Sequence, residues 1–325
     1  MFIGAISLGT LTGGLLAPLS GLLLDRLGGR WVISLGLLLL GGSLILLSFV
    51  NNVWQFYIAM IVGRAGLQGA TTLSLGVVVS KWFVRKRGRA MAVAEVGQRA
   101  GSGLVPLFAQ AIVSTAGWRT AAWSTGVLTW VLGLLPALLF LRRQPEDLGL
   151  NPDGDSDAEV ADVSDMAMEH RYEDSGITLR DALRTSTFWL LAVAVASMFI
   201  VMSGVSLNLI PYLSDQGLSD GAAVSVLTVY AVLAGFSAIG AGLLAEHVQV
   251  TRLLQAAYVT LALATLLLVI VDSTPLGVLY GAAAGLAFGT ISTSFQLVLP
   301  AFFGRRYLGS IRGFMQTLNM VAVAA

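Results

Sequence analysis

The chain has 325 residues, of which 56% are hydrophobic and 11% are charged, and its mean hydropathy is +0.82. Soluble domains carry about 25% charged residues, so this composition excludes an ordinary soluble protein and indicates a polytopic membrane protein. The sequence has no cysteine, which excludes disulfides and cysteine-ligated metals. Its formal net charge of +1 does not suggest a nucleic-acid partner. We expect neither a cofactor nor a metal site.

Apolar runs long enough to cross a bilayer follow one another along the chain. They lie at 2–24, 31–50, 55–80, 89–113, 120–141, 187–212, 222–245, 252–271 and 276–300, with a shorter run at 312–325. A helix of about 20 residues spans the hydrocarbon core, which is about 30 Å thick. The alternating segments of membrane β-strands are absent. The predicted fold class is therefore all-α, a bundle of membrane helices.

Most Lys and Arg residues fall in alternate connections between these runs. The positive-inside rule places such connections in the cytoplasm. We therefore expect a multi-pass protein of a bacterial-type cytoplasmic (inner) membrane, with the basic loops and the central linker in the cytoplasm.

A polar segment from Gly21 to Arg30 separates the first two runs. Its pattern is Gly-x-x-x-Asp-Arg-x-Gly-Gly-Arg. The charges of Asp25, Arg26 and Arg30 are too costly in hydrocarbon, so the segment is a turn at a membrane face. It resembles the loop signature between the second and third spans of the major facilitator superfamily. The resemblance implies that family's fold, a bundle of two pseudo-symmetric halves.

A weaker copy of this segment, Gly242 to His247, lies 221 positions later, counted from Gly21 to Gly242. The repeat indicates two related halves. We assign the first half to 1–141 (family spans two to six), a linker to 142–186, and the second half to 187–325 (spans seven to ten and the start of eleven). By this numbering the chain is expected to be a fragment that lacks span one and the end of the bundle.

The first polar segment is interpreted as a conformational latch formed by Gly21, Asp25, Arg26 and Arg30. A carboxylate at a helix end can pair with an arginine or a helix N-terminus in one conformation and release it in another. Glu246 retains the carboxylate in the second copy. The alternative is that the two arginines only satisfy the charge rule for cytoplasmic loops.

Residues 142–186 form the only long polar segment. Their acidic, low-complexity composition predicts a mostly disordered cytoplasmic linker. Near its end, Thr178 is well placed as a helix N-cap, so a short interfacial helix is predicted at 177–183.

The third run contains Gly63-Arg64-Ala65-Gly66-Leu67-Gln68-Gly69, which resembles the family's Arg-x-x-Gln-Gly pattern. An arginine in lipid costs at least about 2.5 kcal/mol. Arg64 must therefore face a wet cavity or a carboxylate. The functional interpretation is a site for an anion or carboxylate. The alternative is a structural arginine held by backbone carbonyls.

Glu95 and Arg99 lie four positions apart in the next run, on one face of the predicted helix. They can neutralise each other, which is the simpler explanation. An ion pair within a span still costs desolvation, however. Glu95 is also the only acid in any predicted span, so it is the best candidate for a proton carrier. Arg99 would then join Arg64 as a ligand of the substrate anion.

The segment from Lys81 to Gly97 resembles the beginning of span five in monocarboxylate transporters and in relatives of the bacterial oxalate:formate antiporter. The agreement covers Trp82, Phe83, Arg85, Lys86, Arg87, Ala90, Ala94 and Gly97, and the chain departs at Arg89, Ala92 and Val96. The resemblance implies a small organic anion as substrate. Against it, the run at 222–245 lacks the charges that are common in this branch.

Several polar side chains lie in runs that line the cavity in the family, although each is also compatible with a helix-packing hydrogen bond. They are Gln68, Thr71, Asn208, Ser292, Ser294 and Gln296.

The leading hypothesis is a monomeric secondary transporter that carries a small organic anion, of the monocarboxylate or dicarboxylate type, by alternating access. Transport would be proton-coupled or by exchange. One alternative is a proton-driven drug or metabolite efflux antiporter, and another is a non-transporting membrane sensor or assembly protein. An enzyme is not expected, because no span holds paired carboxylates, a histidine cluster or a serine beside a base. The expected partners are a small-molecule substrate and the lipid bilayer.

Overall fold

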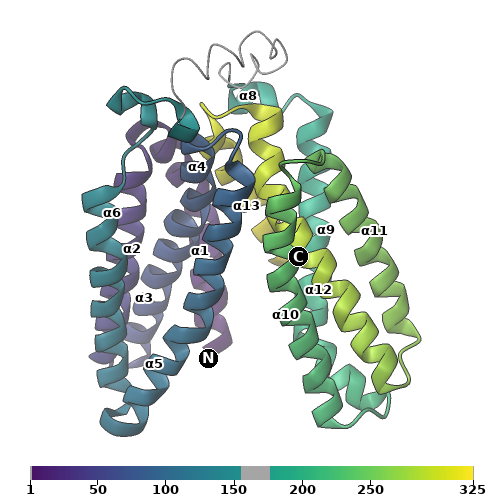
Figure 1. Ribbon diagram of the computed structural model, residues 1–325. Helices are drawn as coiled ribbons and strands as arrows, with labels where there is room; N and C mark the ends of the chain where they lie inside the picture. The colour runs from purple at the N-terminus through teal and green to yellow at the C-terminus, as the bar shows by residue number, and fades with distance from the viewer. Residues whose placement is uncertain (1, 155–175, 325) are drawn as a thin grey trace. The chain divides into compact units, whose positions relative to one another are not determined.

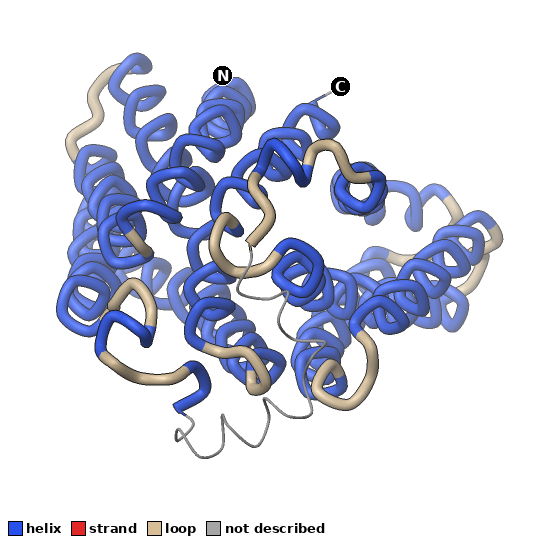
Figure 2. Tube along the Cα trace, turned by 90° about the horizontal axis from the view of Figure 1, so that it is seen from above, coloured by secondary structure: helices blue, strands red, loops and turns tan. Residues whose placement is uncertain are grey.

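The computed structural model describes residues 2–154 and 176–324. Every regular element within these ranges is helical, as Figure 2 shows. This confirms the all-α fold class. It follows from the long apolar runs, because a helix satisfies all its backbone hydrogen bonds internally.

The first half of the chain forms α1 (Phe2–Leu27), α2 (Gly29–Ser48), α3 (Val53–Arg64), η1 (Ala65–Thr71), α4 (Thr72–Trp82), α5 (Arg87–Thr129), η2 (Trp130–Leu134) and α6 (Leu135–Phe140). The remainder forms η3 (Pro145–Leu148), η4 (Pro152–Gly154), α8 (Leu179–Ala182), α9 (Ser186–Asp215), α10 (Asp220–Leu244), α11 (Val250–Val269), α12 (Thr274–Phe303) and α13 (Leu308–Ala324). Figure 1 labels the α-helices.

Six of the described helical segments are long and apolar enough to cross a membrane. One of them, Arg87–Phe140, contains a break at Gly117, whose φ is 81°. Only glycine adopts this left-handed conformation without strain. The break lies between the predicted runs at 89–113 and 120–141. The two predicted runs are therefore two helices that meet at a kink at Gly117.

The run at 55–80 contains a local change of helix type. It begins as α3, continues through the π-helical turn η1, and ends as α4. π-Helical turns are rare and occur frequently at functional sites. This one begins directly after Arg64.

The described residues group into two compact units. The first comprises Met1–Val84, Ala100–Ala192 and Phe303–Ala325, and the second comprises Arg85–Arg99 and Val193–Phe302. The beginning of α5 thus belongs to the second unit, and α13 belongs to the first. The division into halves at residues 141 and 187 stays a prediction.

In the first unit, α1 and α13 approach each other closely through small residues. A Cβ atom on Gly21 would collide with the carbonyl of Gly309, and one on Gly313 would collide with the carbonyl of Ala17. Small residues allow helix backbones in a membrane to come into direct contact. A separate cluster of Ile33, Val78 and Ala137 packs α2, α4 and α6 together.

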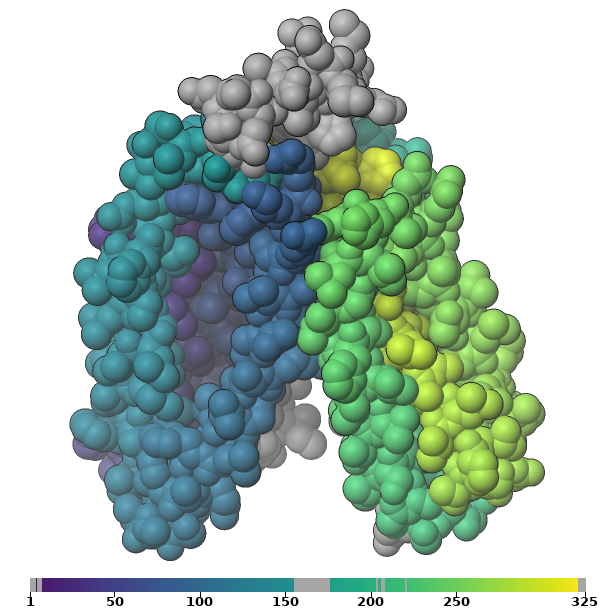
Figure 3. Space-filling model, in the orientation of Figure 1, coloured from purple at the N-terminus to yellow at the C-terminus, as the bar shows by residue number. Residues whose placement is uncertain are grey.

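In the second unit, glycines at every fourth position of α12 face backbone carbonyls of α10. Gly281, Gly285 and Gly289 face Val226, Tyr230 and Ala234, respectively. The apolar core of this unit is formed by α9 to α12, with members such as Leu213 and Ala284. Figure 3 shows α10 to α12, in green to yellow, with all side chains drawn.

Short helical elements lie in both described parts of the polar segment 142–186. η3 and η4 lie near its beginning, and α8 lies near its end. The Thr178 hydroxyl accepts a hydrogen bond from the N–H of Asp181, at 3.3 Å, which confirms the predicted N-cap. The acidic stretch at 155–175, which carries the prediction of disorder, lies outside the described residues.

Candidate functional site

The carboxylate of Asp25 lies at the N-terminus of α13. Its Oδ1 accepts a hydrogen bond from the N–H of Gly309 at 2.8 Å, and its Oδ2 accepts one from the N–H of Ser310 at 2.7 Å. The Ser310 hydroxyl donates a third, at 2.6 Å. The first N–H groups of a helix have no partner within it and carry a partial positive charge. Asp25, which is 9% exposed, therefore caps α13.

This cap depends on the glycine at the first position of the predicted latch. Gly21 lies one helical turn before Asp25, on the face of α1 that contacts α13. Any larger residue there would push Gly309 away. The motif thus combines a close backbone contact with a carboxylate that reaches the helix end beyond it.

The two arginines of the same segment behave differently from Asp25. Arg26 is exposed. The Arg30 guanidinium lies 5.4 Å from the ring centroid of Trp31, a cation–π distance. A different arginine contacts the end of α1. Arg143, which follows α6, donates a hydrogen bond from Nη2 to the carbonyl of Asp25 at 3.3 Å.

The second copy of the motif makes the corresponding contact in the second unit. The Oε2 of Glu246 lies 2.7 Å from Nε of Arg89, and its Oε1 accepts a hydrogen bond from the N–H of Arg89 at 3.2 Å. Arg89 is in the first turn of α5. A Cβ atom on Gly88 would collide with the carbonyl of Gly242.

The two contacts are related by the repeat seen in the sequence. A separation of 221 positions relates Gly21 to Gly242 and Asp25 to Glu246, and it also relates Gly88 to Gly309 and Arg89 to Ser310. In each unit, a carboxylate after one span caps the helix that follows a basic loop. The sequence motif identifies the two carboxylates but not their partners, Ser310 and Arg89. The glycines Gly88 and Gly309, each just after a basic cluster, were the available signal.

Arg64 is the last residue of α3 and is half-buried. Gly9 and Gly13 of α1 make room for this segment, because Cβ atoms on them would lie 2.9 Å from Cγ of Arg64 and 3.1 Å from Cβ of Gln68. Among the residues that the structure describes, no carboxylate pairs with Arg64. No carboxylate of the described ranges therefore compensates the charge of this guanidinium.

Glu95 and Arg99 lie together on α5, and Gln296 of α12 joins them. The Oε2 of Glu95 is 3.8 Å from Nη2 of Arg99, and Nε2 of Gln296 donates to Oε1 of Glu95 at 3.3 Å. Glu95 is 5% exposed, whereas the Arg99 side chain is 38% exposed. The pair is long, so it leaves the guanidinium accessible. Arg64 belongs to the other unit.

The remaining polar candidates fall into two groups. Thr71 and Asn208 donate to carbonyls of their own helical segments, those of Gly66 at 3.0 Å and Gly204 at 2.8 Å. These are helix-internal bonds. In contrast, Oε1 of Gln68 and Oγ of Ser294 are buried without a hydrogen-bond partner within the described ranges. Ser292 is half-buried.

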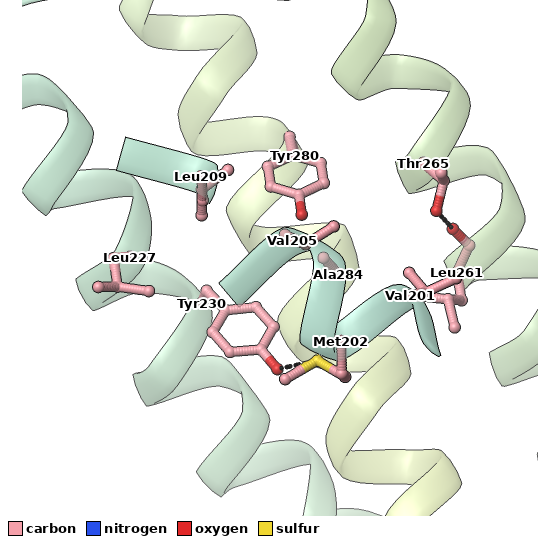
Figure 4. A pocket seen from close by; sticks show the side chains of 10 residues that line it. All are labelled: Val201, Met202, Val205, Leu209, Leu227, Tyr230, Leu261, Thr265, Tyr280 and Ala284. Carbon is pink, nitrogen blue, oxygen red and sulfur yellow. Dashed lines mark hydrogen bonds between the residues drawn. The ribbon is translucent and has the colours of Figure 1, made fainter. Parts of the chain in front are cut away.

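A small pocket lies among α9 to α12 in the second unit (Figure 4). Its volume is about 40 Å³, which is room for a few water molecules. The hydroxyl of Tyr230 contacts Sδ of Met202 at 2.9 Å, and that of Thr265 donates to the carbonyl of Leu261 at 2.8 Å. None of the predicted site residues lines this pocket. It is too small and too apolar for an organic anion.

Residues 2–325 match the family model described as Major Facilitator Superfamily. The chain belongs to the major facilitator superfamily. Members of this family are membrane transport proteins and not enzymes. The apolar helices of this chain agree with a multi-pass membrane protein.

Curated relatives of this superfamily chain include proteins with different named roles. Monocarboxylate transporter 2 of Mesocricetus auratus is 26% identical over 93% of this chain and 64% of its own length. Membrane sensor protein UhpC of Salmonella typhimurium is 25% identical over 60% of this chain and 44% of its own length. A probable hexose phosphate transport protein of Chlamydia pneumoniae is 24% identical over 58% of this chain and 43% of its own length. The chain therefore matches less than two thirds of the length of these relatives.

Solved structures of the superfamily share the fold. The human organic anion transporter MFSD10 superposes with a TM-score of 0.71 at 18% identity, over 100% of this chain and 76% of that one. The transporter FucP, in its outward conformation, gives a TM-score of 0.67 at 18% identity, over 99% and 81%. At these identities the likeness concerns the fold alone.

Proposed function

We propose that the protein is a secondary transporter that moves a small organic anion across the membrane by alternating access. The observation that carries this proposal is Arg64, a charge within a predicted span, at the start of a π-helical turn and without a carboxylate partner among the described residues. A guanidinium offers five donors in a planar fork that matches a carboxylate or phosphate. An anionic substrate would compensate its charge.

The relatives support an anion through their printed names. One is a monocarboxylate transporter, one a probable hexose phosphate transport protein, and one solved structure an organic anion transporter. Carboxylates and phosphate esters share the negative charge that an arginine recognises. The substrate class proposed is therefore an organic anion with a carboxylate or a phosphate group.

Glu95 is proposed as the proton carrier. It is buried, it lies within a predicted span, and it contacts Gln296 at 3.3 Å and Arg99 at 3.8 Å. Protonation would remove a charge that is expensive at this depth, and deprotonation would strengthen the pair with Arg99. The protonated and deprotonated states of Glu95 provide a way to couple the movement of a proton to that of the anion. Exchange of one anion for another would not require Glu95 to change its protonation state.

The cap on α13 is proposed as the latch that holds one transport conformation. A carboxylate that accepts three hydrogen bonds at a helix N-terminus stabilises the state in which those groups meet. Transport then requires the cap to be released and re-formed in each cycle. The basic loops near it would face the cytoplasm of a bacterial-type inner membrane, as the charge rule predicts.

Uptake by proteoliposomes tests this proposal. The protein, expressed from its complete reading frame, is reconstituted and supplied with radiolabelled pyruvate, oxalate or glucose 6-phosphate. At least one anion should accumulate. Arg64→Gln should lower its uptake at least tenfold, and Arg64→Lys should retain part of it. Arg252→Gln, which removes an exposed charge in the first turn of α11, should leave uptake within twofold. Accumulation that Arg64→Gln leaves intact would contradict the anion site.

A membrane sensor is the second candidate function, because two relatives carry that name. A sensor would bind the same anion through Arg64 but would not move it. Binding that depends on Arg64, without accumulation in proteoliposomes, would favour the sensor. Proton-driven export of an uncharged or cationic compound would instead favour the efflux alternative.

A further inference from the structure

A polar cavity of about 370 Å³ lies in the first unit, beside the end of α1 that carries the cap. Its walls come from three segments that are far apart in the sequence. Lys81 is at the end of α4, Arg143 and Glu146 follow α6, and Arg305 and Arg306 precede α13. Its volume falls in the range of small-molecule sites.

The charge of this cavity is strongly one-sided. Four cationic side chains line it against the single carboxylate of Glu146. That carboxylate is 3.3 Å from Nη2 of Arg305. Lys81 is only 5% exposed, so its ammonium is held at the cavity wall away from bulk water. Burying a cation is costly unless an anion compensates it. The carboxylates of Asp25 and Asp147 act on the Lys81 ammonium, but neither of them lines the cavity.

Backbone contacts hold these side chains in place. Arg305 donates from Nη1 to the carbonyl of Lys81 at 3.1 Å, and Arg143 donates to the carbonyl of Asp25 at 3.3 Å. Arg143 also packs over Gly28, where a Cβ atom would lie 2.7 Å from its Cβ. These backbone bonds fix the directions of the Arg305 and Arg143 guanidinium groups at the cavity wall. The cationic wall is therefore largely preorganised.

We infer that this cavity binds a phosphate group with two negative charges, provided by a soluble phosphate compound or by a lipid headgroup. A phosphate dianion offers several acceptor oxygens to converging arginines and a lysine. It would offset most of the net charge of the lining. The cavity is larger than one phosphate, so the group would enter as the end of a larger molecule or with water.

Bound phosphate would also strengthen the cap. Arg306 lies two residues before α13, and Arg143 contacts the residue that caps α13. An anion that bridges these arginines ties the two sides of the cap together. Because it binds better to the capped state, it shifts the equilibrium toward that state. The cavity is thus a regulatory site that is separate from Arg64 and Glu95.

Thermal stability of the purified protein tests the site without any need for transport. Inorganic phosphate and glycerol phosphate are titrated in neutral detergent, with sodium chloride at the same ionic strength as the reference. Both phosphates should raise Tm at saturating concentrations. Arg306→Gln and Arg143→Gln should each weaken the apparent affinity at least tenfold. The matched variant Arg252→Gln, which changes an exposed arginine in the first turn of α11 outside the cavity, should change the apparent affinity less than twofold.

A second arm identifies the source of the phosphate group. The protein is placed in phosphatidylcholine nanodiscs with or without phosphatidic acid. If phosphatidic acid raises Tm, glycerol phosphate does not, and the rise is lost in Arg306→Gln, the site binds a lipid headgroup. Stabilisation by glycerol phosphate assigns it to a soluble compound. No stabilisation in either arm, or an equal response of all variants, overturns the site.

Hydrogen exchange tests the link to the cap. The N–H groups of Gly309 and Ser310 donate hydrogen bonds to the Asp25 carboxylate. Bound phosphate should slow their exchange in the protein and leave it unchanged in Arg306→Gln. Stabilisation without slower exchange at these two amides would overturn the regulatory part of the inference.

Discussion

Oδ2 of Asp25 accepts two hydrogen bonds from Ser310, one from its backbone N–H at 2.7 Å and one from its hydroxyl at 2.6 Å. The two residues are 285 positions apart in the chain. The contact connects the most specific motif of the sequence to the beginning of α13. It also makes the latch interpretation open to direct measurement.

Replacement of Asp25 should loosen the N-terminus of α13. In Asp25→Asn the side chain keeps its shape but loses its charge, and the new NH2 group faces a donor. Hydrogen bonds to a charged group contribute about 1.5–3 kcal/mol. We expect a lower Tm and faster hydrogen exchange at Gly309 and Ser310. Asp272→Asn, in an exposed loop, should change neither, and equal effects of the two variants would contradict the cap.

The close approach of α1 and α13 predicts a different outcome for two glycines. A methyl group in Gly21→Ala would collide with the carbonyl of Gly309 and separate the helices. Gly103→Ala meets open space and gains helix propensity of up to about 1 kcal/mol. Tm should therefore fall in Gly21→Ala and stay equal or rise in Gly103→Ala. A tolerated Gly21→Ala would show that the approach is not required.

The two copies of the cap should differ in strength. Glu246 accepts one backbone N–H at 3.2 Å, and its partner Arg89 has a side chain that is 64% exposed. Exposed ion pairs contribute little. Glu246→Gln should therefore lower Tm by less than Asp25→Asn does, and hydrogen exchange should accelerate only at the first turn of α5. A larger loss in Glu246→Gln would reverse this ranking.

Proton coupling should depend on Glu95. Glu95→Gln can still bond Gln296 but can no longer release a proton. If the anion moves with a proton, this variant should lose uptake driven by a pH gradient and should retain exchange of labelled for unlabelled anion. Asp272→Asn is the matched control, because it removes an exposed acid from a loop. Unchanged gradient-driven uptake in Glu95→Gln would exclude it as the carrier.

The sequence predicts the helices well because their cause is local. Apolar runs set the positions of α1, α2 and α9 to α12, and Thr178 marks the beginning of α8. The break at Gly117 also lies between two predicted runs. The π-helical turn after Arg64 was not predicted, since an extra residue in a helical turn leaves no mark on hydropathy.

The partners of the predicted site residues depend on tertiary contacts instead. The motif identified Asp25, but Ser310 becomes its partner only through the packing of α13 on α1. The basic residues Lys81, Arg143 and Arg305 lie in basic connections, and the sequence pattern indicates only a membrane orientation for them. Their convergence on one cavity requires the fold to bring three distant segments together. Charge patterns along a sequence cannot show such convergence.

Direct binding of an anion by the purified protein tests the central claim, that Arg64 holds an organic anion. Calorimetric titration gives Kd for the unmodified protein and for Arg64→Lys, Arg64→Gln and Arg252→Gln. The titrant is the anion that accumulates in proteoliposomes, or oxalate and pyruvate if no anion accumulates. We predict saturable binding and a Kd at least tenfold higher in Arg64→Gln, which corresponds to about 1.4 kcal/mol. Arg252→Gln should bind as the protein does. An unchanged Kd in Arg64→Gln would contradict the account.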